Sequence, residues 1–182
     1  MHPSHAFRRR PLVAVIGDGT VGEEAPAYLM ARRLGALLID GGYRIITGGL
    51  GGVMEAACRG AHESLHYREG DTVALLPTLN PKDANPWVDI VIPTGLGHAR
   101  NVLVASAEAV VAIGGGAGTL SEMAFAWIYG RLLVALVGVG GWSEKLAGHS
   151  IDERGGLGRE KEACVLCAST PEEVLFLLKE RV

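Results

Sequence analysis

Strand-like apolar runs alternate with helix-like segments along the whole chain, and this alternation constrains the fold more than any other feature. Strands that alternate with helices form βαβ units. We therefore expect an α/β fold: a single-domain, Rossmann-like, doubly wound and mostly parallel sheet with helices on both faces. The predicted strands are Leu12–Ile16, Arg44–Thr47, Asp71–Leu76, Val88–Pro93, Ala109–Ile113, Leu132–Val137 and Ala163–Ala168.

Five segments show helical spacing of apolar residues. The first opens with Glu23 and Glu24, acids that suit a helix N-terminus, and stops at Gly41. The others are 53 to about 64, a helix from near His98, the segment after Thr119, and 171–181. On the helix near His98 one face is predicted to hold Ala99, Val102, Leu103 and Ser106. On the helix after Thr119, the apolar stripe is predicted to hold Leu120, Met123, Ala124, Trp127 and Ile128.

Length and charge narrow the class of protein. A chain of 182 residues suits one domain, which we place at residues 11–182, with residues 1–10 as a flexible N-terminal tail. The 17 basic residues are outnumbered by 20 acidic ones, which argues against nucleic acid as a partner. No apolar run reaches the roughly 18 residues of a membrane span, and the N-terminus lacks a secretory apolar region. We expect a cytoplasmic protein that does not bind membranes.

Two motif matches are set aside. Cys164 and Cys167 fit C-x-x-C but lie in a strand-like run, where residues three apart point to opposite faces, so reduced structural cysteines are expected. The segment from His62 to His66 fits the zinc-protease pattern H-E-x-x-H, but no later helix offers an obvious third ligand. The sequence therefore predicts no metal site.

Two glycine-rich loops follow predicted strands. Gly114–Thr119 leads from a strand into a helix, where free backbone N–H groups and the helix dipole form a phosphate-sized anion site. Thr47–Gly52 is a similar loop after another strand. Each could be only a tight connection. Both lie at the carboxyl edge of a parallel sheet, where such sheets bind ligands, so we expect a nucleotide-like, phosphorylated small molecule.

Two charged residues near these loops are open to two interpretations. Thr119 and Glu122 have the spacing of a capping box, yet Glu122 also falls off the predicted apolar stripe, where a catalytic carboxylate would lie. Arg100 falls in the first helical turn beside His98, where a cation is disfavoured unless an anion binds it. A solvated surface arginine explains the position equally well.

Trp127 could likewise serve a subunit interface or the core.

The segments 94–101 (TGLGHARN), 112–122 (AIGGGAGTLSE) and 48–57 (GGLGGVMEAA) resemble motifs of the Lonely Guy (LOG) superfamily, in a branch that includes the molybdenum cofactor carrier proteins. LOG enzymes hydrolyse the N-glycosidic bond of nucleoside 5′-monophosphates to free base and ribose 5-phosphate. The resemblance implies catalytic roles for Arg100 and Glu122. It supports the predicted phosphate and nucleotide site, which comprises Gly17, Gly48, Gly49, Gly51, Gly52, Gly115, Gly116, Ala117, Gly118 and Thr119.

The resemblance leaves two functions open: a LOG-like phosphoribohydrolase, or a non-catalytic carrier of molybdenum cofactor or another phosphorylated ligand. Gly114, Asn101 and Ser121 stand where LOG enzymes have Pro, Lys and often Glu, which favours the carrier branch. Relatives are usually homodimers, so a homodimer is expected. The older label of lysine decarboxylase is rejected, because a pyridoxal phosphate enzyme needs a lysine for its Schiff base and all four lysines lie in polar segments away from the glycine loops: Lys82, Lys145, Lys161 and Lys179. No cofactor is expected.

Overall fold

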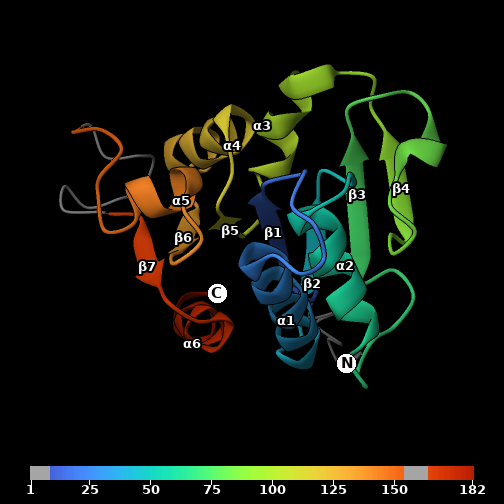
Figure 1. Cartoon of the computed structure of the whole chain (residues 1–182), viewed down its shortest axis with the longest axis horizontal. Helices are drawn as coiled ribbons and strands as arrows, with labels where there is room; N and C mark the ends of the chain where they lie inside the picture. Colours follow the sequence, from blue (N-terminus) through green and yellow to red (C-terminus); the bar gives the residue numbers. More distant parts are fainter. Residues whose placement is uncertain (1–8, 154–163) are drawn as a thin grey trace, which may run out of the picture.

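The computed structural model describes residues 9–153 and 164–182. Within them seven parallel strands form one sheet in the order β4-β3-β2-β1-β5-β6-β7, which confirms the predicted α/β Rossmann-like fold (Figure 1). The order reverses direction between β1 and β5, whose residues pair from Val13 and Ala109 to Gly17 and Ile113. The strands are β1 (Leu12–Gly17), β2 (Arg44–Thr47), β3 (Thr72–Leu76), β4 (Ile90–Pro93), β5 (Ala109–Ile113), β6 (Leu132–Leu136) and β7 (Leu166–Ala168).

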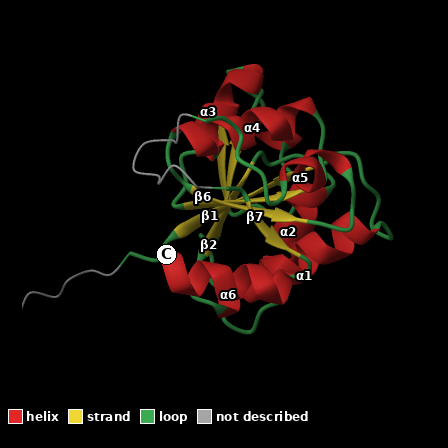
Figure 2. Cartoon of the chain, turned by 90° about the vertical axis from the view of Figure 1, so that its left-hand side faces the viewer, coloured by secondary structure: helices red, strands yellow, loops and turns green. Residues whose placement is uncertain are grey.

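Helices cover both faces of the sheet, as Figure 2 shows with α1 and α6 on one side and α3 and α4 on the other. α5 was not predicted, because its six residues are too few to show helical periodicity. The helices are α1 (Pro26–Asp40), α2 (Val53–His62), α3 (Asn101–Val104), α4 (Ala117–Ile128), α5 (Gly141–Leu146) and α6 (Pro171–Arg181), with 3₁₀ turns η1 (Pro81–Asp83) and η2 (Gly97–Arg100).

The core consists of two apolar layers because successive strand residues face opposite sides of the sheet. Val13 and Val15 of β1 pack with α1, α2 and α6, whereas Ala14 and Ile16 pack with α3 and α4. The second layer contains Trp127, which is almost fully buried. Of the two roles considered for Trp127, the structure therefore supports the core.

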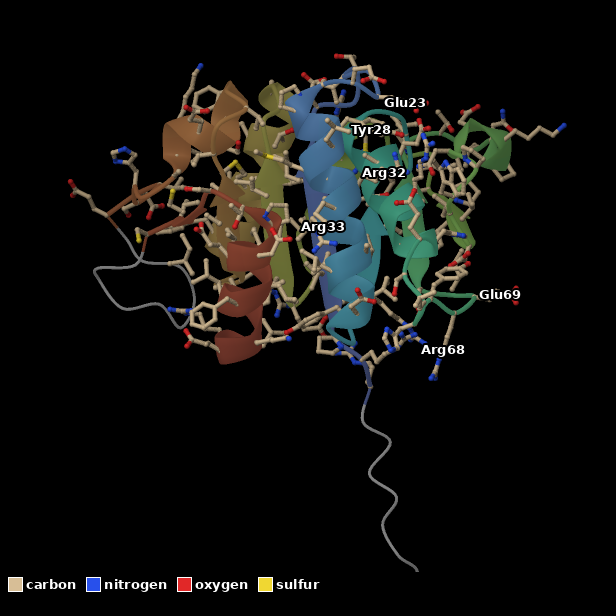
Figure 3. All side chains as sticks on the ribbon, turned by 60° about the horizontal axis from the view of Figure 1, so that its bottom comes forward. Glu23, Tyr28, Arg32, Arg33, Arg68 and Glu69 are labelled. Carbon is tan, nitrogen blue, oxygen red and sulfur yellow. The ribbon has the colours of Figure 1, made fainter. Side chains whose placement is uncertain are left out.

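The predicted start of the first helix was wrong. Glu23 and Glu24 precede α1, whose first helical residue is Pro26, and no acidic residue lies in its first turn. Proline is common at the first helical position because the N–H group that it lacks would have no intrahelical acceptor there. Glu23 instead pairs with Arg59 of α2 at 2.7 Å. Figure 3 places Glu23 near the carboxyl edge of the sheet and Arg68 at the opposite edge.

The face predicted near His98 was also wrong, and the face predicted for α4 was right for Met123 and Trp127 but wrong for Ile128. Near His98 the chain forms η2 and the short α3, and the predicted face is largely exposed, whereas Arg100, Asn101 and Val104 are buried. On α4 the inward residues include Glu122 with Met123, while Ile128 is exposed. α4 is apolar on more than one side, so the apolar pattern alone could not show which side faces the sheet.

The ends of the predicted tail and of the last strand are only partly described. Residues 1–8 of the tail, and Lys161 and Ala163, lie outside the described residues. Arg10, placed by the sequence in the flexible tail, is instead partly buried and binds Asp71, while Arg9 pairs with Glu108. Among the described residues no helix is long and apolar enough to cross a membrane.

Candidate functional site

A cleft of about 290 Å³ lies at the carboxyl edge of the sheet, next to the ends of the paired strands β1 and β5, where the strand order reverses. In open parallel sheets this point of reversed strand order is the usual ligand site, because the loops leave the sheet on opposite faces there. The residues that line it come from the ends of β1 and β2, from η2 and α3, and from α4: Gly17, Asp18, Gly19, Leu50, Met54, His98, Arg100, Asn101, Gly116, Gly118, Thr119 and Glu122.

The N-terminus of α4 forms the wall of the cleft best suited to an anion. No side chain caps this terminus, so the first N–H groups of the helix, from Ala117 to Thr119, have no intrahelical acceptor. Gly116 has open space on its Cβ side. Gly115 adopts φ +88°, and a Cβ there would lie 2.5 Å from Thr119 Cβ, so only glycine fits. This wall can bind one phosphate through backbone donors.

The start of the same loop is fixed to α5. The Ser143 hydroxyl, fully buried, accepts from Gly114 N at 2.8 Å and donates to Leu136 O at 2.9 Å. Trp142 N donates to Gly115 O at 3.0 Å, and a Cβ on Gly141 would meet Gly115 N at 2.6 Å. The unpredicted α5 therefore holds the Gly114–Thr119 loop in place. Gly114, where LOG enzymes have Pro, adopts φ +62°, which proline cannot adopt.

The second glycine loop supports the cleft more than it lines it. A Cβ on Gly48 would lie 2.6 Å from Arg100 Cζ, and one on Gly52 would lie 2.9 Å from Gly19 Cα. The side chain of Asn85, itself buried, donates to Gly49 O at 3.1 Å and to Leu50 O at 3.0 Å. The glycines here allow close approach, and Asn85 ties the loop to the β3–β4 connection.

Arg100 and Glu122 meet at the base of the cleft. Arg100 Nη1 donates to Glu122 Oε1 at 3.0 Å, and the two residues are 7% and 6% exposed. A solvated surface arginine is thereby excluded. Glu122 also does not cap a helix, because Thr119 lies inside α4 rather than at its N-cap. Within the described part of the chain, Arg100 Nε has no hydrogen-bond partner.

Burial outweighs mutual attraction in this pair. Desolvation raises the pKa of Glu122 to about 7, although the charge of Arg100 and its hydrogen bond act in the opposite direction. Desolvation likewise lowers the pKa of Arg100, offset by Glu122. A carboxyl group that titrates near neutral pH inside a cleft can accept or donate a proton during a reaction.

The structure brings together six of the twelve predicted site residues in the cleft lining: Gly17, Arg100, Gly116, Gly118, Thr119 and Glu122. The other six shape the two glycine loops around it: Gly48, Gly49, Gly51, Gly52, Gly115 and Ala117. The prediction of binding residues overlooked the other six lining residues: Asp18, Gly19, Leu50, Met54, His98 and Asn101. A signal for them was present, since the first four lie in or beside loops that follow β1 and β2, and the last two lie next to Arg100 in the segment 94–101.

Two departures from the LOG pattern contact one another. Asn101 Nδ2 donates to Ser121 Oγ at 2.7 Å and, more weakly, to Gly118 O at 3.3 Å. Asn101 is almost fully buried. An uncharged hydrogen bond therefore stands where the LOG motifs have a lysine and often a glutamate, and it joins α3 to the first turns of α4.

Other candidate groups lie away from the cleft. His62 Nε2 contacts Trp87 O at 3.0 Å, whereas His66 Nδ1 contacts Asp40 at 3.1 Å, so the two histidines of the H-E-x-x-H match have different partners. Among described residues no group of three metal-ligating side chains occurs. The three cysteines are free, and burial raises the pKa of Cys58 to about 12.

The sequence model of the SLOG cluster4 family matches residues 10–175. The chain belongs to the SLOG cluster4 family. Its membership agrees with the LOG-type resemblance inferred from the glycine motifs. An uncharacterised protein of Archaeoglobus fulgidus is 44% identical over 126 residues, which cover 68% of this chain and 78% of that protein.

Two solved structures resemble this SLOG cluster4 chain along nearly its full length. The molybdenum cofactor binding protein of Rippkaea orientalis is 34% identical, with a TM-score of 0.75 and coverage of 94% of this chain and 97% of that one. The Moco carrier protein of Chlamydomonas reinhardtii is 32% identical, with a TM-score of 0.73 and the same coverage. These similarities support a LOG-like or carrier protein as the functional class.

Proposed function

We propose that the chain is a phosphoribohydrolase that splits the N-glycosidic bond of a nucleoside 5′-monophosphate into free base and ribose 5-phosphate. The 5′-phosphate would bind the N–H groups at the start of α4, between Gly116 and Thr119. The sugar would then lie over Arg100 and Glu122, and the base would lie toward Leu50 and Met54. The uncapped α4 terminus and the cleft lining support this orientation.

Glu122 and Arg100 would divide the chemistry between them. The ionised Glu122 would orient the attacking water or the ribose hydroxyls and stabilise an oxocarbenium-like transition state, as carboxylates do in glycoside hydrolysis. Arg100, already paired with Glu122 at 3.0 Å, would position the substrate and offset developing negative charge. The observation that carries this proposal is the buried Arg100–Glu122 pair, 3.0 Å apart at the base of the cleft. Burial also raises the pKa of Glu122 to about 7, which suits a carboxyl group that takes part in a reaction.

Incubation with a panel of nucleoside 5′-monophosphates, followed by chromatography of free base, tests the activity. Wild type is expected to release base, and Glu122→Gln is expected to lower the rate at least about 100-fold while still binding nucleotide. Glu63→Gln, on the surface far from the cleft, is the matched control and should keep wild-type turnover. Wild-type turnover in Glu122→Gln would refute the assignment.

A non-catalytic carrier is the second candidate, supported by the names of the two similar structures, a molybdenum cofactor binding protein and a Moco carrier protein. The residues at the cleft fit such a ligand, because the α4 terminus offers donors to a phosphate and Leu50 and Met54 offer an apolar wall to a ring. Ligand-induced thermal stabilisation without any released base would favour the carrier over the hydrolase.

A cytoplasmic homodimer completes the proposal. Leu103 of α3 and Ile128 of α4 are 43% and 51% exposed beside the cleft-forming helices, and a second copy of the chain would cover them. Analytical ultracentrifugation should show a dimer for wild type and a folded monomer for Ile128→Asp. A monomeric wild type would refute the assembly.

A further inference from the structure

Asp18 is a second carboxylate in the cleft, and the proposed chemistry does not use it. It follows β1 directly, and its backbone oxygen accepts from Val53 N at 2.9 Å. Its Oδ1 accepts from Thr20 N at 2.8 Å and from Thr20 Oγ1 at 2.7 Å. These bonds fix the orientation of the side chain. No partner for Oδ2 is found in the described ranges 9–153 and 164–182, so that oxygen keeps its capacity to accept.

The charges in the cleft make this carboxylate unexpected. Arg100 is compensated by Glu122. Among the described residues no other arginine or lysine lines the cleft, and His98 is the remaining titratable group of the lining. An uncompensated carboxylate near a phosphate site repels an anionic ligand. A part of the ligand that donates hydrogen bonds to Asp18 would offset this repulsion, because charge-assisted bonds are about twice as strong as neutral ones.

The surroundings of Asp18 suit a flat ring. Leu50 and Met54 line the same cleft, and Met54 Cε lies 3.2 Å from the place a Cβ on Gly19 would occupy. A carboxylate binds best to two parallel N–H donors. In the 2-amino-4-oxopyrimidine ring, shared by guanine and pterins, a ring N–H and an exocyclic NH₂ lie side by side. Adenine presents a donor beside an acceptor, and hypoxanthine lacks the exocyclic amine.

We infer that Asp18 selects ligands with a 2-amino-4-oxopyrimidine ring, so that the cleft accepts a phosphorylated guanine or pterin compound in preference to adenine or pyrimidine compounds. This inference rests on the proposed phosphate site at α4. It narrows either candidate function, because a hydrolase and a carrier would both recognise the ring at Asp18 and the phosphate at Gly116–Thr119.

Calorimetric titration of the full chain with guanosine, inosine and adenosine 5′-monophosphates, ribose 5-phosphate and neopterin tests the inference. Wild type should bind the guanine nucleotide at least tenfold more tightly than the other two nucleotides. Asp18→Asn, whose amide oxygen can still accept from Thr20 N, should abolish that preference and change ribose 5-phosphate binding less than twofold. The exposed Glu24→Gln should behave as wild type, and unliganded melting temperatures should match.

The possible failures are distinguishable. Equal affinity for the guanine and hypoxanthine nucleotides in wild type would overturn the role of Asp18 while leaving the phosphate site intact. Equal weakening of every probe, ribose 5-phosphate included, by Asp18→Asn would assign Asp18 to the sugar and also overturn the inference. Asp18-dependent binding of neopterin without nucleotide binding would support the inference and refute the nucleotide function. Binding of no probe would refute both.

Discussion

Two arginine–carboxylate pairs lie at opposite edges of the sheet, and they differ in how fully the carboxylate is bound. At the amino edge Asp71 is fully buried and accepts from Arg10 and from Arg68 N at 2.9 Å, with Arg44 3.8 Å away. At the carboxyl edge Glu122 has Arg100 as its partner. Asp71 is nearly saturated with donors, whereas Glu122 retains capacity for a ligand.

Cavity size does not explain which edge is functional. A cavity of about 480 Å³ at the amino edge is larger than the cleft of about 290 Å³ at the carboxyl edge. Arg9 and Arg10, which line the larger cavity, are bound to Glu108 and Asp71. The direction of parallel strands places the free helix N-terminus of α4 only at the carboxyl edge, and an under-satisfied ion pair beside free N–H groups indicates a ligand site better than volume does.

Asp71→Ala gives the largest expected effect on stability. It removes the acceptor of Arg10 and of Arg68 N, so the free energy of unfolding should fall by about 3 kcal/mol, at the low end for buried pairs because Arg10 is partly exposed. At pH 5, where Glu122 is protonated in the folded protein, Glu122→Gln should change it by less than about 1 kcal/mol, because the amide oxygen still accepts from Arg100. Urea denaturation measures both. Equal losses would show that the two pairs have the same structural role.

The pH dependence of stability is the next way to distinguish the Arg100–Glu122 pair from the Arg10–Asp71 pair. Folding raises the pKa of Glu122 from 4.5 to about 7, so between these values the folded protein binds more protons than the unfolded chain. The free energy of unfolding therefore falls as pH rises from about 4.5 to 7 and Glu122 loses its proton. The total loss is up to about 3 kcal/mol at pH 7. Base release should change in the opposite direction, rising through pH 7 as Glu122 ionises. Denaturation curves of Glu122→Gln should lack this component; an unchanged pH profile in that variant would contradict the assignment.

Two glycine substitutions test the geometry at the carboxyl edge. Gly48→Ala would bring a methyl group against the guanidinium of Arg100 and displace it, so ligand affinity or turnover should fall by roughly tenfold or more. Gly116→Ala places its methyl group in open space with no positive φ, and should change affinity by no more than a few-fold. Binding titrations compare them. A larger loss of affinity in Gly116→Ala than in Gly48→Ala would indicate that the loop, rather than Arg100, makes the critical contact with the ligand.

Ser143→Ala has the smallest expected effect. It leaves Gly114 N without its side-chain acceptor, which should cost about 1–2 kcal/mol of stability and weaken phosphate binding a few-fold by loosening the loop. Ser143→Cys, which keeps a weak acceptor, should recover part of the loss. Thermal melts with and without ribose 5-phosphate measure both effects. Unchanged phosphate binding in Ser143→Ala would show that α5 does not support the binding site.

Much of the architecture follows from the sequence because its signals are local. Apolar runs and glycine stops predict the seven strands, and the motifs identify Arg100 and Glu122. The facing of α4 was predicted only in part: Met123 and Trp127 are buried, but Ile128 is exposed and Glu122 is buried. That helix is apolar on more than one side, and only packing against the sheet decides which side faces inward. The contacts of Asn85 and Ser143 join segments 36 and 29 residues apart, and no short-range pattern encodes them.

Amide chemical-shift mapping by NMR during titration with guanosine 5′-monophosphate is the most direct test of a phosphorylated ligand bound at the carboxyl edge. The largest perturbations are expected at Gly116–Thr119 and around Asp18, with none at the amino-edge cavity near Tyr43. Perturbations confined to Gly41–Tyr43, or none at Gly116–Thr119 at saturating ligand, would contradict the site.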